Sequence, residues 1–319
     1  MSTDQVFDCL IIGGGPAGLS TALGLSRILH TAVLFDSGVY RNRNSSHMHT
    51  VSTWDHKNPA EYRAAARKEL TEGRYSSVQI KDVAVAKVEK LGDGFFKATD
   101  ATGAEWMGKK LVLATGSKDE YLDIPGYGAC WATGIYHCLF CHGFEDKDAL
   151  NAGVLAVGDC AKPTVATHLA YQAQQFAKEI TIYTHGSDAL AAELAPLVAA
   201  HSARTTRTIK IEPRRIQQLA KVDGPTASGK VTLAFEDGHR ETEGFLVHKA
   251  NTAVNGPFAQ QLGLELTTTG DIKVAQPIPE TSVSGCFAAG DCATVMKAVA
   301  IAVSAGMAAA AGVSLQLLG

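Results

Sequence analysis

The chain has 319 residues, of which 46% are hydrophobic and 19% are charged, and its formal net charge is −3. This length suits two ordinary domains, and the composition is typical of a soluble globular protein. The weak negative charge and the absence of a basic run disfavour nucleic acid and anionic membranes as partners.

The N-terminal segment carries no targeting signal that we recognise. Residues 1–8 lack the basic region of a signal peptide. No uninterrupted apolar stretch is expected to reach the roughly 18 residues that cross a bilayer. We therefore expect a cytoplasmic protein with no membrane partner.

The first 36 residues predict a βαβ unit. An apolar strand over Val6–Ile12 leads into the glycine-rich stretch Gly13–Gly18, a helix follows, and a second strand over Thr31–Phe35 ends at Asp36. Next come a helix over residues 58–70, two or three strands across 78–99, and an apolar strand over 110–114.

A second βαβ pattern begins at Gly153. It comprises strands over 154–157 and 180–183 and helices over 168–177 and 190–200, followed by strand-like segments near 209–211, 231–235 and 244–248. The tail returns to the first pattern, with a strand over 285–289 and a long helix ending at Leu318.

This order predicts a first domain that is split by an insertion. We expect the first domain to cover residues 1–120 and 249–319, with a second domain over 121–248 inserted in it. The expected fold class is α/β, with two doubly wound Rossmann-like domains.

Gly13, Gly15 and Gly18 form a Gly-x-Gly-x-x-Gly motif between a strand and a helix. Gly13 allows the tight turn, Gly15 lets the backbone approach a pyrophosphate, and Gly18 packs the helix against the strand. Asp36 stands 18 residues after Gly18, at the end of the second strand, where it would accept a hydrogen bond from a ribose hydroxyl.

Two further segments support a flavin site. One is the turn Ala114-Thr115-Gly116 after a strand; the other is Gly290-Asp291 before the last helix. Asp291 would bond a ribitol hydroxyl, although it could also be a simple helix N-cap. Together with the opening motif, these segments indicate FAD in the outer domain. The expected FAD-contacting residues are Gly13, Gly15, Pro16, Ala17, Gly18, Asp36, Ser37, Arg41, His49, Val83, Ala114, Thr115, Gly116, Gly290, Asp291, Lys297, Ala298 and Val299.

Cys138 and Cys141 are the only cysteines of the seven that form a close pair. The other five lie singly among apolar or small residues and are expected to be buried, inert thiols. Two cysteines at this spacing at the start of a helix can close a disulfide, with the first thiol acidified. No second cysteine pair follows at zinc-finger spacing, so we expect no metal.

Three segments carry a resemblance to a known family: the opening glycine motif, Trp131–Gly143 around the two cysteines, and Gly290–Ala293. Asp36–Arg41 and His47–His49 add to it. Over nearly its full length the chain resembles thioredoxin reductase-like FAD-dependent dithiol oxidases of the gliotoxin and holomycin type, within the class II pyridine nucleotide-disulfide oxidoreductases. The resemblance implies that Cys138 attacks the substrate, that Cys141 faces the flavin, and that the protein is a homodimer.

His142 departs from the reductase pattern, which usually has an aspartate directly after the second cysteine. A histidine titrates nearer neutrality and could move the same proton, so His142 is a candidate catalytic residue beside Cys138 and Cys141. It could also be purely structural. By the same resemblance His49 is expected to contact FAD, whereas His47 could simply be solvated.

We expect the inserted domain to lack a working nicotinamide nucleotide site at Gly158–Pro163. Cys160 would add a side chain where the backbone must meet a pyrophosphate, Asp159 adds negative charge, and Pro163 replaces a small residue. In addition, no Lys or Arg occurs between Lys178 and Arg204, where a cluster for the 2′-phosphate is expected. The alternative is an unusual NADPH site.

Without NADPH, electrons would run from a substrate dithiol to Cys138 and Cys141, then to FAD, then to O2, releasing H2O2. The sequence therefore predicts a FAD-dependent thiol:oxygen oxidoreductase that closes an intramolecular disulfide in a small molecule. The resemblance implies an epidithiodiketopiperazine-like secondary metabolite as the substrate. Two alternatives stay open: an NADPH- or ferredoxin-dependent thioredoxin reductase, and a non-catalytic flavin-fold binding or regulatory module.

Overall fold

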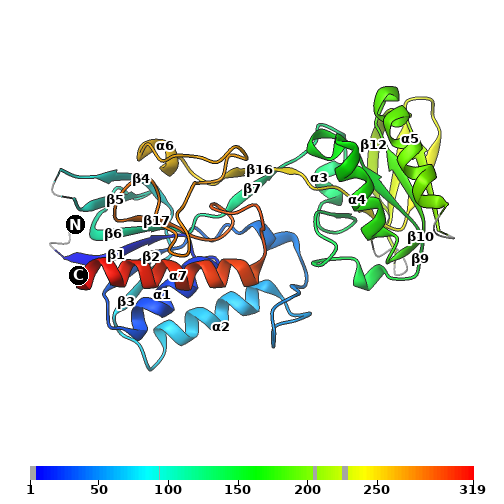
Figure 1. Ribbon diagram of the computed structural model, residues 1–319. Coiled ribbons are helices and arrows are strands. Elements are labelled where there is room, and N and C mark those ends of the chain that lie inside the picture. Colours follow the sequence, from blue (N-terminus) through cyan, green and yellow to red (C-terminus); the bar gives the residue numbers. More distant parts are fainter. Residues whose placement is uncertain (1–4, 93, 204–206, 225–228) are drawn as a thin grey trace. The chain divides into compact units, whose positions relative to one another are not determined.

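The chain leaves its first unit after Lys118 and returns to it at Thr252 in the computed structural model (Figure 1). The structure describes residues 5–92, 94–203, 207–224 and 229–319. Unit 1 comprises Met1–Lys118 and Thr252–Gly319, and unit 2 comprises Asp119–Asn251. The segments that join the units pair as a two-stranded sheet, β7 (Ser117–Glu120) with β16 (Asn251–Val254).

Unit 1 is built on a sheet with the strand order β3-β2-β1-β6-β5-β4, and β17 also pairs with β6. The central strands are parallel and almost fully buried because they are continuous apolar runs covered on both faces. β4 and β5 continue from β6 as an antiparallel meander. The strands are β1 (Val6–Ile12), β2 (Ala32–Phe35), β3 (Val78–Lys81), β4 (Val85–Lys90), β5 (Phe96–Asp100), β6 (Glu105–Leu113) and β17 (Cys286–Ala288).

Three long helices belong to unit 1: α1 (Pro16–Arg27), α2 (Pro59–Thr71) and α7 (Val299–Leu318). Asn58 is the N-cap of helix α2, and its side chain accepts a hydrogen bond from the Ala60 N–H. The short helices η1 (Arg41–Asn44) and α6 (Phe258–Gln261) lie in connecting segments.

Helix α7 packs closely on α1 because small residues line their contact. A Cβ at Gly306 would collide with the Ala17 carbonyl, and the Ser20 hydroxyl donates to the Val303 carbonyl at 2.8 Å. By length and composition α7 could cross a bilayer, with a mean hydropathy of 1.7, although Ser304, Ser314 and Gln316 interrupt its apolar run. The inward face of α7 instead completes the core of unit 1 (Figure 1).

Unit 2 contains a five-stranded parallel sheet in the order β11-β10-β9-β15-β8 and a three-stranded antiparallel sheet, β12-β13-β14. The strands are β8 (Ile135–Tyr136), β9 (Ala149–Leu155), β10 (Ala177–Tyr183), β11 (Thr208–Glu212), β12 (Ile216–Lys221), β13 (Val231–Phe235), β14 (Arg240–Glu243) and β15 (Leu246–Val247). The helices are α3 (Tyr127–Cys130), α4 (Pro163–Ala173) and α5 (Asp188–Ser202), with the 3-10 turns η2 (Phe144–Asp146) and η3 (Gly158–Ala161).

The predicted fold class is confirmed: both units are Rossmann-like α/β units. One helix of unit 2 was misplaced. Helix α4 starts at Pro163 rather than near residue 168, because proline is favourable in the first turn of a helix. Ala177, expected at its end, begins β10 and pairs with Ala149.

Candidate active site

The parallel strands of unit 1 end together at one edge of the sheet. Ile12 pairs with both Phe35 and Leu113, and Leu113 pairs with Ala288. The residues that follow these strands therefore meet at this edge, which is where open α/β sheets bind ligands. They include Gly13, Asp36, Ala114 and Ala289, and the neighbouring β3 delivers Asp82 and Val83 to the same edge.

The glycine loop between β1 and α1 has the backbone that its sequence requires. Gly13 has a φ of +117°, and a Cβ there would collide with the Ala114 carbonyl. A Cβ at Gly18 would collide with the Gly13 carbonyl, so the start of α1 can approach β1 only with glycine at this position.

Gly15 faces open space instead. No atom of the residues that the structure describes lies within 4 Å of a Cβ built on it, and Gly15 is the N-cap of α1. Pro16 takes the first helical position, and the N–H groups of Ala17 and Gly18 lie in the first turn, where helices have no internal acceptors. This combination of room and unpaired donors fits a pyrophosphate.

The expected FAD-binding segment Gly290-Asp291 follows β17, which pairs with β6. Asp291 was considered as a possible N-cap of the last helix, which was wrong: the N-cap of α7 is Ala298, followed by Val299. The Asp291 carboxylate accepts a hydrogen bond from Arg41 Nη1 at 3.1 Å. This contact joins two of the expected FAD-contacting residues across 250 positions of sequence.

Lys297 holds the segment before α7 in place. Its ammonium donates to Asp271 Oδ1 at 2.6 Å and to the carbonyls of Asp291 and Thr294 at 2.7 Å. The ammonium of Lys297 is thus engaged by acceptors of the protein itself, and contact between Lys297 and FAD stays a prediction.

His49 lies in a histidine-rich loop between η1 and α2. Its Nδ1 is 3.4 Å from Asp55 Oδ1, and its ring is 5.3 Å from that of His56. The His56 ring stacks on His47 with the centroids 4.1 Å apart. Contact between His49 and FAD stays a prediction.

Cys138 and Cys141 form a disulfide, with their Cα atoms 5.2 Å apart. The segment is a turn rather than the start of a helix, so the expected location was wrong. The N–H groups of Cys141 and His142 both donate to the Cys138 carbonyl, at 3.1 and 3.0 Å, and Gly143 then turns the chain with a φ of +125°. The segment therefore lacks the helix N-terminus from which the sequence led us to expect acidification of Cys138.

Aromatic rings hold His142 beside the disulfide. Its imidazole stacks on Tyr136 with the centroids 5.1 Å apart and meets His137 edge-on at 6.1 Å. The Tyr136 hydroxyl donates to Asp146 at 2.6 Å, and burial raises the pKa of Asp146. A titratable ring next to Cys141 is thus held in one orientation, as proton transfer requires.

In unit 2, the loop between β9 and α4 differs from what the sequence led us to expect. Cys160 is only 1% exposed and its Sγ points to the Lys249 carbonyl, so its side chain does not obstruct the loop as predicted. Pro163 is the first residue of α4 and favours the helix. The Asp159 side chain is 71% exposed and lies 3.5 Å from Lys162, so its negative charge is the remaining objection to a phosphate here.

A basic residue lies near the loop after β10, although the sequence between Lys178 and Arg204 contains none. A Cβ at Gly186 would be 3.5 Å from that of Arg215, which precedes β12. Arg215 Nε is 3.3 Å from Glu236. Sequence reasoning missed this residue because only the fold brings positions 186 and 215 together.

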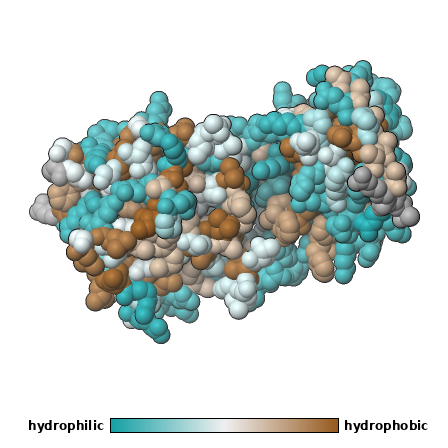
Figure 2. Space-filling model, viewed as in Figure 1, coloured by the Kyte–Doolittle hydropathy of each residue, from teal (hydrophilic) through white to brown (hydrophobic). Residues whose placement is uncertain are grey.

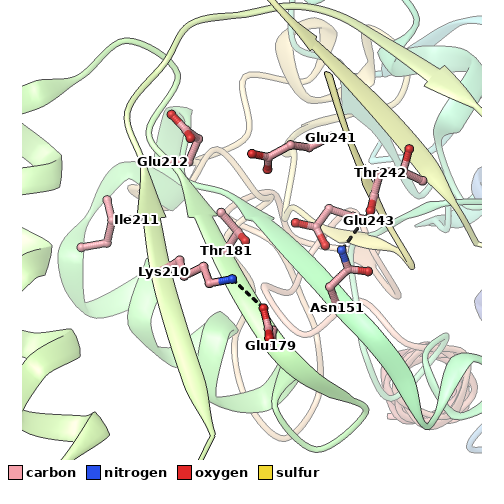
Figure 3. Close-up of a pocket in the computed structure, with 9 residues that line it drawn as sticks. All are labelled: Asn151, Glu179, Thr181, Lys210, Ile211, Glu212, Glu241, Thr242 and Glu243. Atoms are coloured by element: carbon pink, nitrogen blue, oxygen red, sulfur yellow. Dashed lines mark hydrogen bonds and ion pairs between the residues drawn. The ribbon is translucent and has the colours of Figure 1, made fainter. Parts of the chain in front are cut away.

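Unit 2 also contains an acidic cavity of about 490 Å³ that involves none of the predicted site residues (Figure 3). It is lined by Asn151, Glu179, Thr181, Lys210, Ile211, Glu212, Glu241, Thr242 and Glu243. The Tyr183 hydroxyl lies 2.5 Å from Glu243 and 3.0 Å from Glu241. Glu243 is 2% exposed, and burial raises its pKa to about 7.

Comparisons with known proteins agree with this arrangement. Residues 7–306 match the model of the pyridine nucleotide-disulphide oxidoreductase family. The chain is 51% identical to a thioredoxin reductase, aclD, of Aspergillus oryzae, covering 98% of this chain and 96% of the relative. It is 43% identical to the thioredoxin reductase sirT of Leptosphaeria maculans, covering 99% and 95%.

Among solved structures, an oxidoreductase from Agrobacterium tumefaciens superimposes with a TM-score of 0.84 at 28% identity, covering 98% of this chain and 99% of that one. The glycine loop of unit 1, with its open space at Gly15, fits the pyrophosphate of the flavin cofactor of this family. The chain therefore belongs to the pyridine nucleotide-disulphide oxidoreductase family, as a thioredoxin reductase-like oxidoreductase whose cofactor is FAD.

Proposed function

We propose that the protein is a dithiol oxidase that closes an intramolecular disulfide in a small molecule, with an epidithiodiketopiperazine-like metabolite as its substrate. The observation that carries the proposal is a contrast within unit 2. The Cys138–Cys141 pair is complete, whereas the loop that would bind a nicotinamide nucleotide presents the exposed Asp159 carboxylate.

Cys138 and Cys141 exchange two electrons and two protons with the substrate. One substrate thiolate attacks Cys138, breaking the protein disulfide and forming a mixed disulfide; the second substrate thiol then displaces Cys138. The substrate leaves with a new disulfide, and Cys138 and Cys141 are left as thiols. Bound FAD would supply the acceptor for these two electrons and deliver them to O2, which with two protons becomes H2O2.

His142 is proposed to manage the protons of this exchange. It follows Cys141 directly, and its ring is held by Tyr136 and His137. At a pH near neutrality an imidazole can generally accept a proton from a thiol, which produces the attacking thiolate, and can return that proton to a leaving thiolate.

The test is oxygen consumption with dithiothreitol and with a reduced epidithio compound. The proposal expects O2 uptake with stoichiometric H2O2 and one disulfide formed per O2. Absence of uptake with both dithiols in the FAD-loaded protein would refute it.

A second candidate, an NADPH-driven thioredoxin reductase, is favoured by one observation. Arg215 lies beside the Gly186 loop, where a cation could meet a 2′-phosphate. Its partner Glu236 and the exposed Asp159 both oppose an additional anion. Reduction of the FAD by NADPH separates the two candidates.

We further propose that the protein acts as a cytoplasmic homodimer. Helix α7 exposes Ile301, Met307, Leu315 and Leu318, which are 36%, 48%, 61% and 71% exposed. Figure 2 shows apolar side chains gathered on the face of unit 1 where α7 lies. A second copy could cover them, and sedimentation of the FAD-loaded protein tests this.

A further inference from the structure

The carboxylate of Asp36 is held from three sides within unit 1. Oδ1 accepts a hydrogen bond from the Gly38 N–H at 2.9 Å. Oδ2 accepts one from the Tyr40 hydroxyl at 2.6 Å and one from Arg67 Nη1 at 2.8 Å. The Asp36 side chain is 2% exposed, so its negative charge is compensated by these donors rather than by water.

Arg67 reaches Asp36 from helix α2 and is itself fixed at its other nitrogen. Nη2 donates to Asp82 Oδ1 at 2.6 Å, so the planar guanidinium bridges the residues that follow β2 and β3. Its side chain is 27% exposed, which puts it at the rim of the edge where the strands end. Because both terminal nitrogens of Arg67 are hydrogen-bonded, the orientation of its guanidinium is fixed as well as the position of its positive charge.

Tyr40 is held as a hydrogen-bond donor. The Arg63 guanidinium lies 3.8 Å from the centre of the Tyr40 ring and donates to Asn42 Oδ1 at 3.0 Å. Burial and the neighbouring Asp36 raise the pKa of Tyr40 to about 12. The phenol therefore keeps its proton and continues to donate to Asp36 at neutral pH.

We infer that Arg67 is a positioning residue for the adenosine half of FAD, acting through Asp36. Arg67 and Tyr40 together occupy Oδ2. Oδ1 accepts only the Gly38 N–H among the described residues. A carboxylate oxygen has two acceptor positions, so Oδ1 keeps one for a ribose hydroxyl. The inference rests on FAD being the cofactor and on Asp36 meeting its ribose; it does not depend on which thiol substrate is oxidised.

The two halves of FAD provide the test. FMN lacks the adenosine, so a residue that acts on the ribose changes FAD affinity and leaves FMN affinity alone. A residue that merely stabilises unit 1 weakens both flavins together. The full-length chain is stripped of flavin, and the dissociation constants of FAD and FMN are measured by quenching of flavin fluorescence.

Arg67→Met is expected to weaken FAD binding by roughly 10- to 100-fold, the range for loss of a charge-assisted hydrogen bond. FMN binding should stay within about 2-fold. Arg67→Lys should restore part of the loss. Lys68→Met is the matched control, because Lys68 neighbours Arg67 on α2 and is 72% exposed; it should change neither constant.

The coupling to Asp36 is tested separately. In an Asp36→Asn background, Arg67→Met should cause little further loss of FAD affinity. Tyr40→Phe, which removes the other donor to Oδ2, should shift the FAD constant in the same direction and serves if Arg67→Met does not fold. Equal weakening of FAD and FMN, an unchanged FAD constant, or additive losses with Asp36→Asn would each overturn the inference.

Discussion

Both units contain a parallel strand followed by a loop and a helix, but the two loops differ in conformation and in charge. In unit 1 the loop between β1 and α1 leaves open space at Gly15, and no described side chain caps the start of the helix there. In unit 2 the loop between β9 and α4 forms the 3-10 turn η3, with Asp159 exposed and Cys160 turned into the core.

The difference distinguishes what the core of each unit requires from what a pyrophosphate would require. Both loops join a buried parallel strand to a helix, and both units keep an apolar core between sheet and helices. Retaining the core requires only apolar residues of suitable size, whereas binding a pyrophosphate requires particular backbone positions and no nearby negative charge. Unit 2 therefore keeps its core and its cysteine pair with a loop that differs from the one in unit 1.

The largest effect is expected at the Cys138–Cys141 disulfide of unit 2. Cys141→Ser should abolish dithiol-dependent O2 uptake while leaving the FAD content of the protein unchanged, because the disulfide is lost and the glycine loop lies in unit 1. Uptake is measured with an oxygen electrode. Cys130→Ala is the control, since burial raises the pKa of that thiol and makes it unreactive; dithiol-dependent turnover that persists in Cys141→Ser would rule out the disulfide as the electron entry point.

Equivalent alanine substitutions in the two loops test whether the loops differ as described. Gly13→Ala should destabilise unit 1 strongly and lower its FAD content, because a φ of +117° is strained for alanine and the Cβ would collide with Ala114. Gly158→Ala, with a φ of +61° and no atom within 4 Å, should cost only about 1–2 kcal/mol. Melting temperature and the ratio of flavin to protein absorbance report both effects; similar FAD losses for the two variants would contradict the contrast.

A smaller effect is expected from the proposed proton carrier. His142→Phe keeps an aromatic ring on Tyr136 but removes the titratable nitrogen. Turnover with dithiothreitol should fall by roughly 100-fold near pH 7, the scale of general acid–base catalysis, and should recover as the pH rises and the substrate thiol ionises unaided. His201→Phe is the matched control, because His201 likewise stacks on a tyrosine of unit 2, Tyr171, with the centroids 4.0 Å apart. A pH–rate profile unchanged in shape for His142→Phe would assign that ring a structural role.

The acidic cavity predicts a pH effect confined to unit 2. Burial raises the pKa of Glu243 from 4.5 to about 7 in the folded state. The folded protein thus binds this proton more tightly than the unfolded chain does. The stabilisation is complete below about pH 4.5 and is lost as the pH rises to about 7, by up to about 3 kcal/mol.

Glu243→Gln tests this effect, because the amide keeps the shape of the neutral acid. Urea unfolding at pH 5 and pH 8 should show a smaller loss of stability with pH in the variant than in the wild type. Glu193→Gln, on the exposed side of α5, should behave like wild type. An identical pH dependence in all three proteins would show that Glu243 is not the group responsible.

Sequence patterns predicted the buried strands well and the local geometry of the sites less well. The strands expected over 6–12 and 231–235 coincide with β1 and β13, because continuous or alternating apolar runs are set by burial alone. The sequence predicts the cysteine pair but places it at a helix start, whereas Gly143 and the two hydrogen bonds to the Cys138 carbonyl make the segment a turn.

Contacts between distant segments could not be predicted from one sequence. Cys160 turns inward because the Lys249 carbonyl lies behind it, and Arg215 reaches the Gly186 loop because β12 begins there. Arg67 carries no motif, and only the parallel register of β2 and β3 brings Asp36 and Asp82 within its reach.

Electrons are proposed to enter this flavoprotein from a dithiol and not from a nicotinamide nucleotide. The most direct test is anaerobic mixing of the FAD-loaded protein with NADPH or with dithiothreitol, followed by flavin absorbance in a stopped-flow instrument. The account predicts rapid bleaching by dithiothreitol, lost in Cys141→Ser, and no bleaching by NADPH on the timescale of turnover. Rapid bleaching by NADPH would contradict it and would make the protein a reductase.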